Sequence, residues 1–220
     1  MKRILCYGDS NTWGFTPGCG VRFDENTRWT KIVQKILGDE YEIIEDGING
    51  RTTVWDHPYL GSYVNGYKGL PFSLFRAKPI DLVVMMLGTN DIIYTDAEGT
   101  YRGLYKVAKA LKNADSVFEG DSDGSKNIFV HNPDVLLVAP VVSSESTISD
   151  PDGGFRYRES RKIIEKTKQV AEALSLPFFD ASSVAAASNV DGIHMDEENH
   201  LKLGKALAEE IRKHFSKEAI

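Results

Sequence analysis

The chain has 220 residues, of which 41% are hydrophobic and 26% are charged, and its formal net charge at pH 7 is −6. This length and composition fit one soluble domain, which we place at residues 1–220. The acidic balance excludes the basic surface field that attracts nucleic acid, and no apolar stretch approaches the roughly 20 residues of a membrane span. We therefore expect neither nucleic acid nor a membrane as a partner.

Apolar runs of strand length alternate along the chain with stretches of helical period, which is typical of a parallel sheet. The run at 82–87 is apolar on both faces, as a central parallel strand should be. In chain order, the expected elements are a strand at Ile4–Gly8, a helix at Trp29–Leu37, strands at Tyr41–Glu45 and Asp81–Leu87, a helix at Tyr101–Ala114, a strand at Val135–Ala139, a helix at Phe155–Leu174, a strand at Pro177–Phe179 and a helix at Glu197–Phe215.

These elements indicate a three-layer α/β/α sandwich with a five-stranded parallel sheet in flavodoxin-like order and a ligand crevice outside the carboxyl ends of the strands. Two connecting regions, 55–75 and 116–133, are too long for simple connections and are candidates for lids, interfaces or mobile surface. Gly120-Asp121-Ser122 lies in the second region, where no strand precedes it, so we do not expect it to carry a nucleophile.

The cysteines and the start of the chain favour a cytoplasmic protein. The apolar run Ile4–Tyr7 is far too short for the core of a signal peptide. Cys6 falls in the first expected strand and Cys19 in a glycine-rich loop, so we expect two reduced thiols rather than a disulfide.

Gly8-Asp9-Ser10 follows the first strand, which would present a serine at its carboxyl end. A serine hydroxyl is a weak nucleophile that needs a neighbouring base and a group that orients the base. Asp191 and His194 supply a candidate orienter and base. The alternatives are a turn or cap at Ser10, and a helix cap or two ligands of a metal at Asp191 and His194. No third ligand has suitable spacing, so we expect no metal and no cofactor.

Two further strand ends would open onto the same crevice as Ser10. The second strand runs into Gly50, and the third ends at Gly88-Thr89-Asn90-Asp91. An acyl-transfer transition state carries negative charge on the former carbonyl oxygen, and the N–H groups of Ser10 and Gly50 and the Asn90 side chain are candidate donors to it. The structural alternatives are a left-handed turn at Gly50 and a strand-ending turn at Asn90.

Four blocks of this sequence resemble those of the SGNH hydrolases, also called GDSL esterases and lipases. Their order, spacing and positions after predicted strands match over essentially the whole chain, and the residues around them are most similar to the bacterial arylesterase/acyltransferase branch. The blocks are Gly8-Asp9-Ser10, Gly50, Gly88-Thr89-Asn90-Asp91 and Asp191-x-x-His194.

The resemblance implies a role for each residue of the site. Ser10 would attack an ester carbonyl, His194 would take the proton and return it to the leaving alcohol, and Asp191 would hold the imidazole in its productive tautomer. The N–H groups of Ser10 and Gly50 and the Asn90 side chain would form the oxyanion hole.

The surroundings of these blocks suggest a substrate pocket. Asn11 stands where the family name has Leu, so we expect altered packing or polarity at the pocket floor. Val142, after the fourth strand, would face the crevice on the alcohol side, and the apolar segment 59–63 favours a homo-oligomer. Aromatic side chains close to the blocks are candidates to line the pocket, with core packing as their alternative: Trp13, Phe15, Trp55 and Tyr94.

Two charged residues beside the blocks are expected to be structural. Asp9 fits a turn-forming or helix-capping role better than that of an acid catalyst. Arg51 fits a structural ion pair better than a steering site for an anionic substrate.

The sequence therefore predicts a serine esterase that acts on small carboxylic esters, with short acyl chains on aryl, alkyl or sugar alcohols. Water or another alcohol would resolve an acyl-serine intermediate, so acyltransferase activity is included. A carbohydrate deacetylase of the acetylxylan type is the nearest enzymatic alternative. A non-catalytic flavodoxin-like module that binds phosphate or nucleotide is the alternative from a different class, although the usual phosphate-binding glycine patterns are missing.

Overall fold

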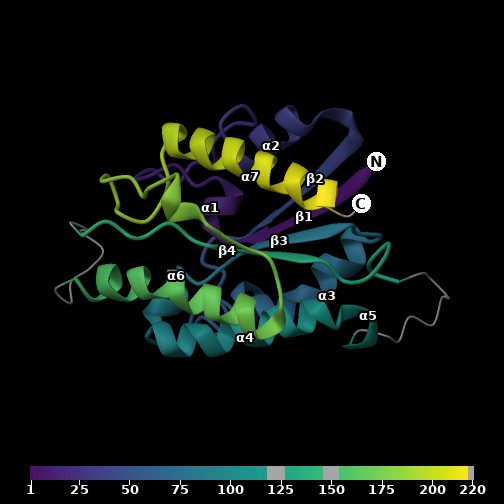
Figure 1. Ribbon diagram of the computed structural model, residues 1–220. Coiled ribbons are helices and arrows are strands. Elements are labelled where there is room, and N and C mark those ends of the chain that lie inside the picture. The colour runs from purple at the N-terminus through teal and green to yellow at the C-terminus, as the bar shows by residue number, and fades with distance from the viewer. Residues whose placement is uncertain (118–126, 146–153, 218–220) are drawn as a thin grey trace.

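The computed structural model of the protein describes residues 1–117, 127–145 and 154–217. The strands are β1 (Lys2–Gly8), β2 (Tyr41–Gly47), β3 (Leu82–Met86), β4 (Val135–Ala139) and β5 (Phe178–Asp180). All pair in parallel in the order β2-β1-β3-β4-β5, and helices cover both faces of the sheet (Figure 1). The predicted three-layer sandwich of flavodoxin-like order is confirmed.

The helices are α1 (Ser10–Trp13), α2 (Trp29–Leu37), α3 (Gly66–Ala77), α4 (Ala97–Lys112), α5 (Ala114–Val117), α6 (Phe155–Leu174) and α7 (Glu197–Lys217). Short 3-10 helices lie at Gly38–Glu40, Ser62–Val64, Asp91–Ile93 and Ala181–Ser183. In Figure 1, α2 and α7 cover one face of the sheet, and α3, α4 and α6 cover the other. No helix in the described part of the chain is long and apolar enough to cross a membrane.

Each face of the sheet has its own apolar layer, because alternate side chains of a strand point to opposite faces. In β1, Leu5 and Tyr7 pack into the layer shared with α3, α4 and α6, whereas Ile4 and Cys6 pack into the layer shared with α2 and α7. A strand covered on both sides needs apolar residues at every position, which explains the continuous apolar run of β3.

Helix α3 corrects one prediction. The sequence predicts a loop over 55–75, but α3 occupies this region from Gly66 onward. Asn65 caps the helix by accepting a hydrogen bond from the Lys68 N–H at 3.1 Å. Leu70 and Leu74 are fully buried in the core, and this packing outweighs the poor helix propensity of Pro71.

Helix α4 begins at Ala97 rather than at the predicted Tyr101. The Asp96 side chain accepts a hydrogen bond from the Gly99 N–H at 2.8 Å and so starts the helix earlier. In the predicted loop 116–133, the tripeptide Gly120-Asp121-Ser122 lies outside the described residues.

The carboxyl ends of β1, β2 and β3 lie level with one another, which brings their loops to one edge of the sheet. Gly8 is in register with both Gly47 of β2 and Met86 of β3. A Cβ atom at Gly47 would lie only 2.1 Å from the Trp13 nitrogen. Glycine at this position therefore lets α1 cross closely over the end of β2.

Candidate active site

Ser10 occupies the first position of α1, directly after the turn that ends β1. Oδ1 of Asp9 accepts a hydrogen bond from the Asn11 N–H at 3.0 Å, so Asp9 caps the helix as the sequence predicts. A Cβ atom at Gly8 would lie 2.0 Å from Oγ1 of Thr12, so the turn is too tight for any residue but glycine. This tight turn from strand to helix presents the Ser10 hydroxyl at the edge of the sheet.

Ser10, His194 and Asp191 form one line of hydrogen bonds. Oγ of Ser10 lies 2.9 Å from Nε2 of His194, and Nδ1 of His194 lies 2.8 Å from Oδ2 of Asp191. Because an ionised carboxylate can only accept, Nδ1 carries the proton in the neutral ring and Nε2 presents its lone pair to the serine hydroxyl. This is the geometry in which a histidine can take a proton from a serine.

The Asp191 carboxylate is held by backbone donors as well as by the imidazole. Its Oδ1 accepts from the N–H groups of Ile193 at 3.0 Å and His194 at 2.9 Å, and its Oδ2 accepts from Gly18 at 3.1 Å. Partial burial raises the pKa of Asp191, but the hydrogen bonds from His194 and Ile193 outweigh it and leave this pKa below its usual value. Asp191 is therefore ionised at neutral pH.

The loop that carries His194 is bonded on several sides. The His194 carbonyl accepts from the Ser188 N–H at 2.8 Å, and the Gly192 carbonyl accepts from the Ser144 N–H, also at 2.8 Å. The ring of Phe15 stacks on the imidazole, with 4.1 Å between ring centroids and 24° between planes. Contacts from the loop after β4 and from the loop after α1 thus restrict the position of the candidate base.

The candidate oxyanion donors lie in the loops after β2 and β3. Gly50 has φ +77°, the left-handed conformation considered in the sequence analysis. The Asn90 side chain is half-buried and donates one hydrogen bond from Nδ2 to the Arg51 carbonyl at 3.0 Å. An amide nitrogen carries two hydrogens, so this bond fixes the side chain and leaves its second N–H for another acceptor.

Arg51 is a structural ion-pair residue, as the sequence predicts. Its side chain is 2% exposed, and its guanidinium binds Oδ1 of Asp46 at 2.8 Å. The same group donates to the Gly8 carbonyl at 2.9 Å and lies 4.1 Å from the centre of the Tyr7 ring. Arg51 therefore joins the end of β1, the end of β2 and the loop that contains Gly50.

Two buried carboxyl groups lie next to the candidate catalytic residues in sequence. Burial raises the pKa of Asp9 to about 6, and burial raises the pKa of Asp91 to about 7. Asp91 accepts hydrogen bonds from the backbone N–H and the hydroxyl of Thr53. Oδ2 of Asp9 is buried with no hydrogen-bond partner in the described ranges. Ionisation of Asp9 therefore lowers the stability of the folded protein.

The predicted pocket residues lie in different places. Trp13 lines a cavity of about 660 Å³ between the end of β2 and α3, together with Ile48, Tyr63 and Phe72. Trp55 and Tyr94 stack on each other instead, with 6.3 Å between centroids and 13° between planes. Val142 is half-buried, and its N–H donates to the Ser182 hydroxyl at 2.9 Å.

Asn11, which the sequence predicts at the pocket floor, is a buried residue. Its side chain is 1% exposed, and it binds the loop of the candidate base at both ends of the amide. Nδ2 donates to the Ile193 carbonyl at 3.2 Å, and Oδ1 accepts from the Met195 N–H at 3.0 Å. Asn11 therefore ties the turn of the candidate nucleophile to the loop of the candidate base.

Sequence reasoning missed two contacts of this site, those of Gly18 with Asp191 and of Asn11 with the loop around His194. Both join residues more than 170 positions apart, and neither residue type carries a local signal for such a partner. Within the described ranges, no group of three or more His, Cys, Asp or Glu side chains is arranged to hold a metal ion.

Comparison with protein families finds one match. The profile of the GDSL-like lipase/acylhydrolase family matches residues 6–202. A search of curated protein sequences gives no match.

Several solved structures are similar to this chain over almost its whole length. The M. smegmatis aryl esterase has 32% sequence identity and a TM-score of 0.85, and the alignment covers 97% of this chain and 99% of the other. A carbohydrate acetylesterase from Sinorhizobium meliloti has 30% identity and a TM-score of 0.85 with the same coverage. A putative arylesterase from Agrobacterium tumefaciens has 33% identity and a TM-score of 0.84, again covering 97% and 99%.

Proposed function

Because this chain belongs to the GDSL-like lipase/acylhydrolase family and is a carboxylic ester hydrolase, we propose that it cleaves small carboxylic esters through an acyl-serine on Ser10. The observation that carries this proposal is the line of hydrogen bonds from Ser10 through His194 to Asp191. Its substrates have short acyl chains on aryl, alkyl or sugar alcohols. The alternative of a binding module without catalysis leaves this line of hydrogen bonds without a use.

In the first step, Oγ of Ser10 attacks the ester carbonyl carbon while its proton passes to Nε2 of His194. The contact of 2.9 Å between these atoms is within the range for direct proton transfer. The imidazolium that forms donates from Nδ1 to the ionised Asp191, which stabilises its positive charge. The proton on Nε2 then goes to the leaving alkoxide, which departs as an alcohol.

The attack turns the carbonyl oxygen into an oxyanion. We assign its donors to the N–H groups of Ser10 and Gly50 and to the second N–H of Asn90. The bond from Asn90 to the Arg51 carbonyl supports this assignment, because it orients the amide before the substrate binds. Donors that are already oriented lose little free energy to reorganisation when the charge develops.

In the second step, His194 takes a proton from an incoming water, and the hydroxide oxygen attacks the acyl-serine carbon. The acid is released, and the proton returns to Ser10. An alcohol in place of water gives a new ester by the same proton transfers. We therefore propose acyl transfer as a second outcome at this site, selected by how far the pocket disfavours water.

The cavity beside Trp13 is our candidate for one part of the substrate site. Trp13 belongs to the same short helix as Ser10, and Ile48 lies in the loop that leads to Gly50. With about 660 Å³, the cavity has room for a small aryl or sugar group.

A carbohydrate ester is the second candidate substrate, since one of the similar structures described above is a carbohydrate acetylesterase. Faster release of acetate from acetylated xylose than from p-nitrophenyl acetate would favour it. The reverse order would favour the aryl and alkyl esters.

The test of the proposed function compares wild type with Ser10→Ala on p-nitrophenyl acetate, butyrate and octanoate, with circular dichroism as the folding control. We expect turnover in the wild type and its loss in a folded Ser10→Ala. A phosphonyl fluoride should add its mass to Ser10 in the wild type alone. Near-normal turnover in Ser10→Ala would overturn the mechanism, and the dependence on chain length would size the acyl pocket.

We also propose a homo-oligomer in the cytoplasm. Tyr59 is 93% exposed and Phe72 is 79% exposed, and both belong to the aromatic surface formed by residues 59–63 and α3. The free thiols of Cys6 and Cys19 support a reducing compartment. A sedimentation experiment that finds only the 24.5 kDa species would overturn the oligomer.

A further inference from the structure

Residues 14–23 form a short hairpin between α1 and the segment that leads to α2, which we call the 14–23 hairpin. Phe15 and Arg22 pair as an antiparallel bridge. The Thr16 N–H donates to the Val21 carbonyl at 2.9 Å, and the Phe23 N–H donates to the Gly14 carbonyl at 2.7 Å. These bonds hold the hairpin together independently of the site.

The tip of the hairpin reaches Asp191. The Gly18 N–H donates at 3.1 Å to Oδ2 of Asp191, the same oxygen that contacts Nδ1 of His194. Gly18 has φ +74°, and a Cβ atom there would lie 2.7 Å from Cγ1 of Val190. Only glycine permits this conformation and this close approach together. The hairpin therefore supplies a fixed donor to the carboxylate that orients the base.

The base of the hairpin reaches His194. The Phe15 ring lies nearly parallel to the imidazole at a centroid distance of 4.1 Å, so it covers one face of the ring. The bonds at Nδ1 and Nε2 lie in the plane of the imidazole and do not prevent the ring from tilting out of that plane. A stacked phenyl ring restricts that tilt. Gly18 and Phe15 thus act on the two members of the hydrogen-bonded pair from one hairpin.

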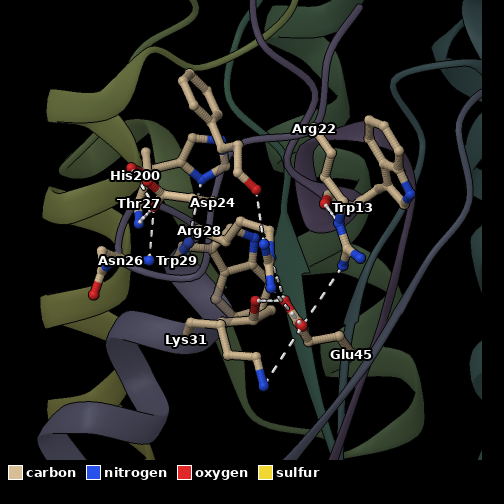
Figure 2. A network of polar contacts seen from close by, with 12 residues as sticks. Trp13, Arg22, Asp24, Asn26, Thr27, Arg28, Trp29, Lys31, Glu45 and His200 are labelled. Carbon is tan, nitrogen blue, oxygen red and sulfur yellow. Dashed lines mark hydrogen bonds and ion pairs between the residues drawn. The ribbon is translucent and has the colours of Figure 1, made fainter.

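Glu45 of β2 fastens the other side of the hairpin to the sheet (Figure 2). Arg22 lies 3.6 Å from Oε2 of Glu45 and donates from Nε to the Trp13 carbonyl at 2.7 Å. Arg28 binds both Glu45 oxygens, at 2.9 and 3.1 Å, and donates to the Phe23 carbonyl at 2.7 Å. The side chains of Glu45 and Arg28 are 13% and 10% exposed, so this ion pair is largely sheltered from solvent, whereas the Arg22 side chain is 39% exposed.

The Glu45 carboxylate is well suited to this task. Thr30 donates a hydrogen bond to it, and Lys31 lies 3.7 Å from its Oε2. Burial raises the pKa of Glu45, but the hydrogen bonds from Arg28 and Thr30 outweigh it and leave this pKa below its usual value. The anchor is therefore ionised at neutral pH.

We propose that the 14–23 hairpin positions His194 and Asp191 for proton transfer, through Phe15 and Gly18, and that Glu45 is a positioning residue that acts through this hairpin. The inference rests on the proposed roles of Ser10, His194 and Asp191. It gives the ion pairs of Glu45 in Figure 2, which we call the charge cluster, a function in the reaction. A small misplacement of a base relative to its nucleophile lowers kcat while leaving substrate binding intact.

The test uses Phe15→Leu, Glu45→Gln and the double variant, with Phe215→Leu as the matched control. Phe215 is also a half-buried phenylalanine, but it packs on Lys2 and Tyr41 at the opposite ends of the strands. We expect each single variant to lower kcat about tenfold, and the control to match wild type. KM should stay within about twofold of wild type for Phe15→Leu. Glu45 also lines the cavity beside Trp13, so KM of Glu45→Gln reports on that cavity and not on the hairpin. We expect the double variant to lose less than the product of the single losses, because both act on one pair.

A proton spectrum supplies a readout that a merely structural role would not move. The Nδ1 proton of His194, identified by its loss in Asp191→Asn, should exchange with water faster in Phe15→Leu and in Glu45→Gln than in wild type. Thermal unfolding checks that each variant is folded, and Phe15→Leu leaves the charge cluster intact if Glu45→Gln fails to fold. An unchanged proton signal with unchanged kcat, or a rise in KM alone in Phe15→Leu, would overturn the inference.

Ser10→Ala, assayed together with these variants, separates the role of the hairpin from the proposed function. Suppose that Ser10→Ala is inactive while Phe15→Leu and Glu45→Gln are fully active. This result would contradict the role of the hairpin and support the proposed function. Activity in Ser10→Ala would remove the proposed function itself. If kcat of the double variant falls by the product of the two single factors, Phe15 and Glu45 act independently, and this outcome contradicts the inference.

Discussion

The side-chain amide of Asn90 is bonded to the backbone carbonyl of Arg51 at 3.0 Å, so the loop after β3 is locked to the loop after β2. The two loops that it joins carry Asn90 and Gly50, to which we assign donors for the oxyanion. The bond makes the amide a rigid donor rather than one that must find its orientation after substrate has bound.

Asn90→Ala should therefore lower kcat by about 10²–10³, with little change in KM, because the lost bond forms only as charge develops. Steady-state kinetics on p-nitrophenyl acetate measure both constants. Asn90→Asp is a matched variant of the same size that lacks the donor, and we expect it to be at least as slow. A change confined to KM would assign Asn90 to substrate binding instead.

Asp191→Asn should lower kcat by ~10⁴ with the fold retained, because an asparagine cannot hold the imidazole in the tautomer that accepts a proton at Nε2. The amide nitrogen would take the place of Oδ2, which also accepts from the Gly18 N–H, so the contact with the hairpin tip is lost as well. Comparison of kcat at matched circular dichroism tests this. A loss below about tenfold would contradict the assigned role of Asp191.

Asp9→Asn should stabilise the protein at neutral pH. Burial raises the pKa of Asp9 to about 6, whereas an unfolded aspartate titrates near 3.9, so the folded state binds more protons between these values. Wild-type stability then falls as pH rises from about 4 to about 6, by up to about 3 kcal/mol, and stays low above that. A neutral Asn keeps the capping oxygen and avoids this loss.

Urea unfolding of wild type and Asp9→Asn from pH 4 to pH 8 measures this effect. The free energy of unfolding of Asp9→Asn should be close to that of wild type near pH 4. The difference should grow up to about pH 6 and stay constant above that. A difference that does not change with pH would contradict the buried-charge interpretation of Asp9.

Arg51→Met should destabilise the fold by about 3–5 kcal/mol, because it leaves the Asp46 carboxylate buried and without its main partner. Asp46→Asn combined with Arg51→Met should recover part of that loss, since it removes the stranded charge. Urea denaturation of the single and double variants tests the pair. Equal stabilities for the Arg51 single variant and the double variant would show that the cost does not come from the uncompensated carboxylate.

The positions of the strands could be predicted because a sheet covered on both faces demands apolar residues throughout, as in β3. Parallel strands end at one edge of a sheet, so the common edge of the loops after β1, β2 and β3 could be predicted too, and the register of Gly8 with Gly47 and Met86 confirms it. Helix α3 could not be predicted, because Pro71 and the glycines around it argue against a helix locally. Burial of Leu70 and Leu74 in the assembled core stabilises it, together with the cap at Asn65.

The site could be predicted as a list of residues but not as a set of contacts. Ser10 and His194 carry recognisable local patterns, whereas the partner of Gly18 depends on how a hairpin near one end of the chain meets a loop 173 residues away. Asn11 shows the same limit. An asparagine after the nucleophile fits the pocket floor as well as it fits a hydrogen bond to the loop at Ile193.

The bonds of Asn11 to Ile193 and Met195 also bear on how the activity arises during synthesis. The proposed base follows the proposed nucleophile by 184 residues in the sequence. A nascent chain can form most of the sheet before it has any catalytic competence. A chain that ends before His194 contains all five strands but lacks the proposed base, so ester cleavage by this mechanism requires more than the completed sheet.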